Sequence, residues 1–145
     1  MNTSRSMKLS LLAAGLLALS TAYAADPMTQ ADFKAAKDKI EADYKADKDA
    51  CKSMKDNAKD VCEKEAKAKE KTARADLDFK HTGKDSDRMK AAEVKAEQDY
   101  AVAKEKCEDM KGDQERACKK EAKAAEDKAK ADLKAEKKAA AKTAG

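Results

Sequence analysis

The sequence predicts an all-α protein made of two tandem helix–turn–helix repeats, each closed by a disulfide, with no strands. Three observations support this fold class. Ala, Lys and Glu, which are strong helix formers, dominate the chain. A segment of 35 residues recurs at an offset of 56 residues, and each copy holds two cysteines separated by ten residues. No β-branched run of alternating polarity interrupts the two copies.

Residues 1–24 have the pattern of an export signal peptide. Two basic residues precede the apolar run 9–19, and residues 22–24 (Ala-Tyr-Ala) supply the small–x–small pattern of a cleavage site. The apolar run is too short to span a bilayer, so we expect no stable membrane insertion after cleavage. The expected location is the periplasm or the outside of a bacterium. Translation starts at Met1 or at Met7, and both starts leave a plausible signal.

The first repeat spans residues 25–80 and the second spans residues 88–134. Aligning residues 43–77 with 99–133 gives seventeen identities in 35 positions. Apolar residues recur in steps of four, seven and eleven, which keep to one face of an α-helix. The stripe in the first copy comprises Phe33, Ile40, Tyr44, Cys51, Cys62, Ala66, Ala73 and Leu77, and the second comprises Met89, Ala96, Tyr100, Cys107, Cys118, Ala122, Ala129 and Leu133.

Three kinds of break punctuate the helices. Residues 81–87 (HTGKDSD) cluster Gly, Ser and Asp, and predict a loop between the repeats. Weaker breaks lie between the paired cysteines, where Asn57 and Asp113 suit a helix N-cap and Gly112 suits the left-handed end of a helix. Residues 135–145 are basic and Ala-rich, and we expect a flexible tail there.

The four cysteines predict two disulfides and allow three connectivities. In a local arrangement Cys51 pairs with Cys62, and Cys107 pairs with Cys118. In the alternative, one long antiparallel hairpin folds around residues 81–87 and is stapled by Cys51–Cys118 and Cys62–Cys107. The spacing of eleven puts both cysteines of a long helix on one face, which suits the alternative. We favour the local arrangement, because helix-stop and helix-start residues lie between the cysteines of each copy.

No catalytic residue, cofactor or metal site is predicted. The cysteine spacing matches neither the C-x2–4-C of zinc sites nor the C-x-x-C of redox pairs. His81, the only histidine, falls in the expected loop and is interpreted as solvated. We expect Tyr44 and Tyr100 to pack against an opposing helix. Met54 and Met110 are interpreted as gap-fillers beside the turns.

Composition argues against an ordinary globular enzyme. Charged residues make up 43% of the chain and aromatic residues 3%, and few large aliphatic residues remain outside the signal to build a core. Residues 25–145 hold 31 basic and 29 acidic residues, so no carboxylate pair stands out. We therefore expect a non-enzymatic periplasmic helical protein with a structural, protective or interaction role in the cell envelope.

The alternative function is a polyanion-binding module for lipid headgroups, lipopolysaccharide or nucleic acid. Residues 128–142 carry six lysines against Asp132 and Glu136, and binding by phosphate neutralisation would weaken steeply as salt rises. The expected partner is an envelope protein or an anionic envelope component, and the sequence leaves its identity open.

The segments 51–68 and 107–124, each a C-x10-C followed by Lys-Glu-Ala-Lys-Ala, resemble a group of small exported bacterial proteins of unknown function. Their composition is similar to the Lys/Ala/Glu-rich helical region of the Tol-system envelope protein, without counterparts of its membrane anchor or globular domain. The resemblance implies an exported, helical, cysteine-bridged protein, and it carries over no functional residue.

Overall fold

The structure is a computed structural model that describes residues 28–143, so the expected signal peptide of residues 1–24 lies outside the described residues. Four α-helices follow one another: α1 (Gln30–Cys51), α2 (Asp56–Thr82), α3 (Asp85–Lys106) and α4 (Asp113–Thr143). A short 3-10 helix, η1 (Cys107–Asp109), extends α3. Residues 28–143 contain no strand, which confirms the all-α fold class.

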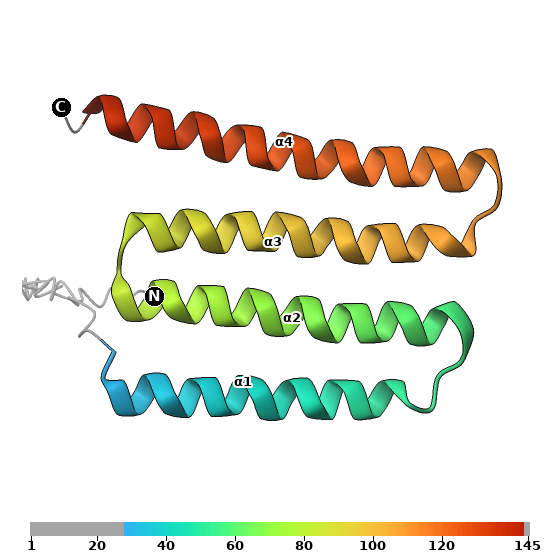
Figure 1. Ribbon diagram of the computed structural model, residues 1–145, viewed down its shortest axis with the longest axis horizontal. Helices are drawn as coiled ribbons and strands as arrows, with labels where there is room; N and C mark the ends of the chain where they lie inside the picture. Colours follow the sequence, from blue (N-terminus) through green and yellow to red (C-terminus); the bar gives the residue numbers. More distant parts are fainter. Residues whose placement is uncertain (1–27, 144–145) are drawn as a thin grey trace, which may run out of the picture.

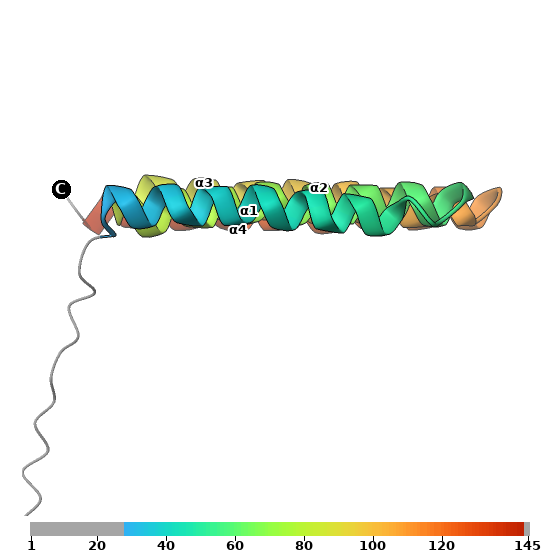
Figure 2. The ribbon, with the colours of Figure 1, turned by 90° about the horizontal axis from the view of Figure 1, so that it is seen from below.

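The four helices lie side by side in one antiparallel layer (Figure 1). The main contacts join α1 to α2, α2 to α3, and α3 to α4. Viewed from its edge, the layer is one helix thick (Figure 2). A four-helix bundle would instead enclose a core between all four helices. Burial in this protein is therefore confined to the three seams between neighbouring helices.

The layer consists of two hairpins, α1–α2 and α3–α4, that correspond to the two sequence repeats. A disulfide closes each hairpin beside its turn, and both disulfide-closed tips point to the same end of the molecule (Figure 1). The connection from α2 to α3 lies at the opposite end, as do the start of α1 and the end of α4. The prediction of tandem disulfide-closed helix–turn–helix repeats is confirmed.

The predicted apolar stripes form the two seams within the hairpins. Cys51 and Cys107 are fully buried, and Ala66, Leu77 and Ala96 are each less than a tenth exposed. The remaining stripe residues are half-buried. One apolar stripe on each helix is sufficient to close a hairpin, because each helix then buries one side against its partner.

The central seam between α2 and α3 uses a second stripe, which the repeat pattern did not reveal. On α2 this stripe lies opposite the first one: Ala75 follows Ala66 by nine residues, or half a turn around the helix. The alanines of this stripe allow close approach of α2 and α3. The buried or half-buried members are Val61, Ala68, Ala75 and Phe79 on α2, and Ala91, Val94 and Ala101 on α3.

Polar contacts fix the register of this seam near the disulfide end. Lys64 pairs with Glu105 at 3.2 Å, and Lys106 pairs with Glu65 at 2.6 Å. The side-chain amide of Asn57 donates to the backbone carbonyl of Glu105 at 3.3 Å. Asn57 therefore joins the two hairpins and does not cap α2, contrary to the sequence interpretation.

The loop between the repeats is shorter than residues 81–87. Because α2 runs to Thr82 and α3 begins at Asp85, only Gly83 and Lys84 connect them. Gly83 adopts the left-handed conformation with φ of 63°, and its N–H donates to the carbonyl of Phe79 at 2.8 Å. A glycine in this conformation ends a helix within one residue, so a short connection suffices.

Residues 135–143 do not form an irregular tail but continue α4 to Thr143. Ala and Lys are strong helix formers, and neither Pro nor Gly interrupts this stretch. Arg88 of α3 also pairs with Glu136 at 2.8 Å, which ties this part of α4 to its neighbour.

Candidate functional site

The four cysteines form two equivalent disulfides beside the hairpin turns. Cys51 bonds to Cys62 and Cys107 bonds to Cys118, with Cα–Cα distances of 5.7 Å in both pairs. The local connectivity is therefore the one observed, and the long stapled hairpin is not. Because all four thiols are consumed, the disulfides cross-link the hairpins and leave no cysteine free.

The hairpin tips expose two methionines. Met54 is 43% exposed and Met110 is 42% exposed, and they occupy equivalent positions in the two repeats. The interpretation of both as gap-fillers is wrong, because the turns project beyond the ends of the seams and place no helix over them.

His81 is neither in a loop nor solvated, contrary to the sequence interpretation. It lies in the last turn of α2, half-buried, and its ring stacks on Phe33 of α1 with centroids 4.3 Å apart. Its Nε2 lies 3.2 Å from the side-chain nitrogen of Gln30, whereas Nδ1 is buried without a hydrogen-bond partner among the described residues. The Phe33–His81 stack closes the open end of the first hairpin.

Tyr44 and Tyr100 lie half-buried at equivalent places in the two hairpin seams. The Lys123 ammonium of α4 lies 5.6 Å from the centre of the Tyr100 ring, and Lys48 lies 5.7 Å from that of Tyr44. Both distances allow a cation–π contact. The contact of Tyr100 joins α3 to α4, as expected for a residue that packs against an opposing helix, whereas the contact of Tyr44 lies within α1.

An ion-pair network lies in the seam between α3 and α4. Glu126, the one charged residue less than a tenth exposed among those described, accepts hydrogen bonds from Lys130 and from Lys123, both at 3.0 Å. Lys130 also reaches Glu97 of α3 at 2.8 Å. The Lys130 and Lys123 ammonium groups lower the pKa of Glu126, and Glu97 and Glu126 raise the pKa of Lys130.

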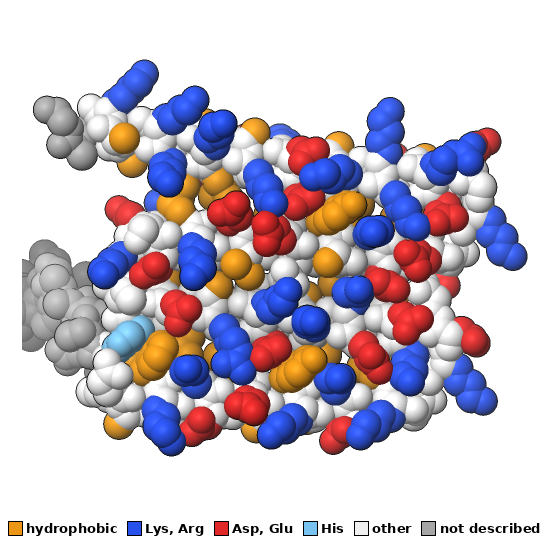
Figure 3. All heavy atoms as spheres, in the orientation of Figure 1, with side chains coloured by type: hydrophobic (Ala, Val, Ile, Leu, Met, Phe, Trp, Pro, Cys, Tyr) orange, Lys and Arg blue, Asp and Glu red, His pale blue; other side chains and the backbone are white. Residues whose placement is uncertain are grey.

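The most distinctive hollow in the described surface lies beyond this network, between α3 and α4 at the end opposite the disulfides. It has a volume of about 400 Å³. In Figure 3 the surface is hollowed between α3 and α4 at this end. Its lining combines four lysines with an apolar floor and one carboxylate: Lys90, Lys130, Lys134 and Lys137, with Met89 and Leu133, and Ser86 and Glu93. We call this hollow the lysine cleft.

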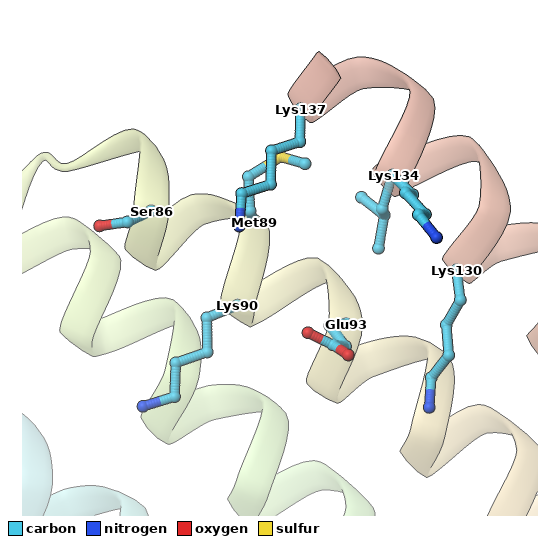
Figure 4. Close-up of a pocket in the computed structure, with 8 residues that line it drawn as sticks. Ser86, Met89, Lys90, Glu93, Lys130, Lys134 and Lys137 are labelled. Atoms are coloured by element: carbon cyan, nitrogen blue, oxygen red, sulfur yellow. The ribbon is translucent and has the colours of Figure 1, made fainter. Parts of the chain in front are cut away.

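The lysines of the cleft differ in their pairing. Lys130, Lys134 and Lys137 come from successive turns of α4, and Lys137 extends across Met89 (Figure 4). Lys130 belongs to the ion-pair network, whereas Lys134 and Lys137 form no ion pair with any described residue. Lys90 also has no such partner, and it points away from α4. Positive charge in the cleft therefore exceeds what its single carboxylate neutralises.

Two further kinds of site in residues 28–143 would be a metal centre and a membrane-spanning helix. No group of three or more His, Cys, Asp or Glu side chains in this part of the chain could hold a metal ion. No helix among the described residues is both long and apolar enough to cross a bilayer. The lysine cleft is therefore the arrangement with the clearest binding chemistry, and its chemistry favours anions.

Comparison of the chain with models of protein families, with characterised proteins and with solved structures finds no match.

Proposed function

We propose that this chain is a non-enzymatic helical protein of the cell envelope, exported to the periplasm or beyond, with a structural, protective or interaction role. The observation that supports this proposal most is the single helical layer stapled at both hairpin tips (Figure 1). Stable disulfides are typical of oxidising compartments. A layer one helix thick also presents two broad faces for contact.

The charge pattern of these faces fits an interaction role. Lys, Arg, Asp and Glu side chains are interspersed over the face shown in Figure 3. Most exposed ion pairs join residues of one helix, such as Lys39 with Asp43 and Lys95 with Asp99. Such exposed pairs contribute little to stability because water screens them, so a partner can rearrange them at little cost.

Site-specific photo-crosslinking in the exported chain tests this role. Lys67 and Asp76 are exposed on α2 and nine residues apart, so they point to opposite faces of the layer. A photo-reactive residue at each position should give a discrete adduct from at least one face in intact cells. The Cys51→Ser/Cys107→Ser variant, in which neither disulfide can form, serves as the control and should lose the adduct. Absence of an adduct from both faces would contradict the proposal.

Export has its own test. The intact mass of the exported chain should correspond to residues 25–145 with two disulfides. A chain that keeps residues 1–24 and has four free thiols would contradict the proposed location.

A second candidate function is polyanion binding, and the lysine cleft favours it. The cleft and its surroundings on α4 concentrate lysines that lack ion-pair partners among the described residues, namely Lys134, Lys137 and Lys138. Phosphate contacts release counterions, so binding to heparin or anionic vesicles should fall steeply between about 50 and 200 mM salt. The variant Lys134→Gln/Lys137→Gln/Lys138→Gln should bind more weakly, whereas Lys67→Gln/Lys71→Gln/Lys80→Gln, with three exposed lysines of α2 replaced, should bind like the original chain.

A further inference from the structure

The two hairpins carry different side chains at equivalent places, and the difference produces the lysine cleft. Positions 33 and 81 of the first hairpin correspond to positions 89 and 137 of the second. In the first hairpin Phe33 stacks on His81 at 4.3 Å, and an aromatic pair fills the end of the seam. In the second, Met89 and Lys137 occupy these places and line an open hollow.

The floor of the hollow is correspondingly less enclosed. Leu77 of the first hairpin is 5% exposed, whereas its equivalent, Leu133, is only half-buried and lines the cleft. Met89 adds a flexible and polarisable side chain, which adapts to irregular apolar ligands. An uncovered Leu–Met floor is a place where an apolar chain can remove surface from water.

The charge at the rim also differs between the hairpins. Asp78 of the first hairpin corresponds to Lys134 of the second, and His81 corresponds to Lys137. In the opposite sense, Glu93 of the second hairpin takes the place of Lys37, so the rim of the second hairpin carries one more basic residue than the first and the same number of carboxylates. Of the α4 lysines at this rim, Lys130 is paired with Glu97 and Glu126, whereas Lys134 and Lys137 have no ion-pair partner among the described residues, so a bound anion would supply one.

We propose that the lysine cleft binds a single-chain anionic amphiphile, that is, one alkyl chain that carries a phosphate or carboxylate headgroup. Lys134 and Lys137 hold the headgroup, and the alkyl chain covers Met89 and Leu133. The volume of about 400 Å³ lies within the range of ~300–1,000 Å³ that small-molecule sites occupy. The inference rests on the second candidate function and assigns a ligand class and a site to it.

Titration with monomeric dodecyl phosphate tests the proposal by calorimetry, with the methionine methyl groups followed by NMR. We expect one molecule bound per chain and a shift of the Met89 methyl signal, while the signals of Met54 and Met110 stay in place. Dodecyl maltoside, which lacks the charge, and inorganic phosphate, which lacks the chain, should each bind at least tenfold more weakly. Equal binding of either probe would overturn the proposal.

The first hairpin supplies the matched variants. Met89→Phe/Lys137→His gives the second hairpin the side chains that fill the first, and it should weaken dodecyl phosphate binding at least tenfold with the helical circular dichroism retained. Lys134→Asp introduces the carboxylate found at position 78. It changes only an exposed side chain, and it should also weaken binding at least tenfold. Unchanged affinity in both variants would overturn the proposal.

Failure of the proposed cleft ligand and failure of the polyanion-binding function can be told apart. If heparin binds with steep salt dependence but dodecyl phosphate does not bind, the polyanion-binding function stands and the cleft assignment fails. If dodecyl phosphate binds and heparin does not, the cleft assignment stands and the broader function fails.

Discussion

Glu126 shows how a single buried charge can tie two helices together. The carboxylate on α4 accepts hydrogen bonds from Lys123 and Lys130, and Lys130 extends the network to Glu97 of α3. The hydrogen bonds from the two ammonium groups lower the pKa of Glu126. Ionised Glu126 therefore stabilises the fold above the ordinary carboxyl pKa of about 4.3. This stabilisation is lost as the pH falls through the lower pKa of the folded state.

Replacement of Glu126 by Gln should lower the free energy of unfolding by up to about 1 kcal/mol at pH 7, because two partly exposed ammonium groups lose an ionised partner. The difference from the original chain should shrink as the pH falls from 5 to 2, where Glu126 itself becomes neutral. Urea unfolding followed by circular dichroism measures both effects.

Glu121→Gln is the matched control, because Glu121 is exposed on the same helix and forms no ion pair with the described residues. Its effect should be small at all pH values. If Glu126→Gln and Glu121→Gln behave alike, the network does not contribute to stability.

At the scale of the element, the outer helices α1 and α4 differ from the central helices α2 and α3 in the side chains of their outward-facing sides. This difference disfavours the packing of a further helix there. Because α4 is the repeat equivalent of α2, the outer side of α4 corresponds to the side of α2 that packs on α3. In the same way, the outer side of α1 corresponds to the side of α3 that packs on α2. Smaller or charged side chains replace those of the central seam. At positions where the seam has Val61, Phe79, Val94 and Ala101, the outer sides expose Ala117, Ala135, Asp38 and Lys45. Charged side chains thus end the layer at α1, whereas at α4 the side chains are alanines that lack the bulk of those in the central seam.

The variant Asp38→Val/Lys45→Ala/Ala117→Val/Ala135→Phe restores seam residues on both outer sides. We expect it to associate α4-to-α1 into open linear arrays, because a head-to-tail contact in a flat layer does not close. Its sedimentation coefficient should rise with concentration.

The variant Ala117→Val/Ala135→Phe alone should remain monomeric, since Asp38 and Lys45 still line the opposing side. A fourfold variant that stays monomeric over the same concentrations would show that the outer sides do not cap the layer in this way.

We expect the hairpins to depend on their disulfides more than on their seams, because the buried members of these seams are mostly alanines and cysteines. Each disulfide closes a loop of about twelve residues, which contributes about 3 kcal/mol in the chain-entropy model. Reduction should therefore lower the melting temperature substantially and leave partial helix at low temperature, because helix propensity is unaffected. Circular dichroism melts with and without reductant measure this. An unchanged melt after verified reduction would mean that packing or self-association stabilises the helices.

The two disulfide-closed hairpins could be predicted from the sequence, but their side-by-side arrangement in a single layer could not. The stripes that include Tyr44, Leu77 and Tyr100 repeat in both copies, and they were found where the structure buries them. The stripe through Ala75 and Ala91 joins different copies, and its α2 members recur in α4 only as alanines, so it is hidden among the many alanines of the chain. The lysine cleft was missed for a related reason: it arises where the copies differ, and comparison of repeats emphasises what they share.

For the whole molecule, the single layer predicts an unusual shape in solution. Helices of 27 residues are about 40 Å long, and four of them spaced by 8–10 Å form a plate about 10 Å thick. Such a plate has a radius of gyration of about 16 Å. A compact domain of the same 116 described residues would have about 13 Å.

Small-angle X-ray scattering of the chain without residues 1–24 separates these two shapes. We expect the larger radius and a scattering profile typical of a thin plate. A radius near 13 Å would mean that the layer folds over into a four-helix bundle in solution. The Met89→Phe/Lys137→His variant is a useful control, because it changes the cleft and should leave the overall shape intact.

The connectivity of the disulfides has a consequence for biosynthesis. Each bond joins two cysteines that are consecutive in the chain, Cys51 to Cys62 and Cys107 to Cys118. If the chain enters an oxidising space N-terminus first, the second cysteine to arrive is the correct partner of the first, and this pair can form before the third arrives. Oxidation in order of arrival therefore yields the native bonds directly, and a thiol oxidant alone suffices, with no isomerase needed to reshuffle them.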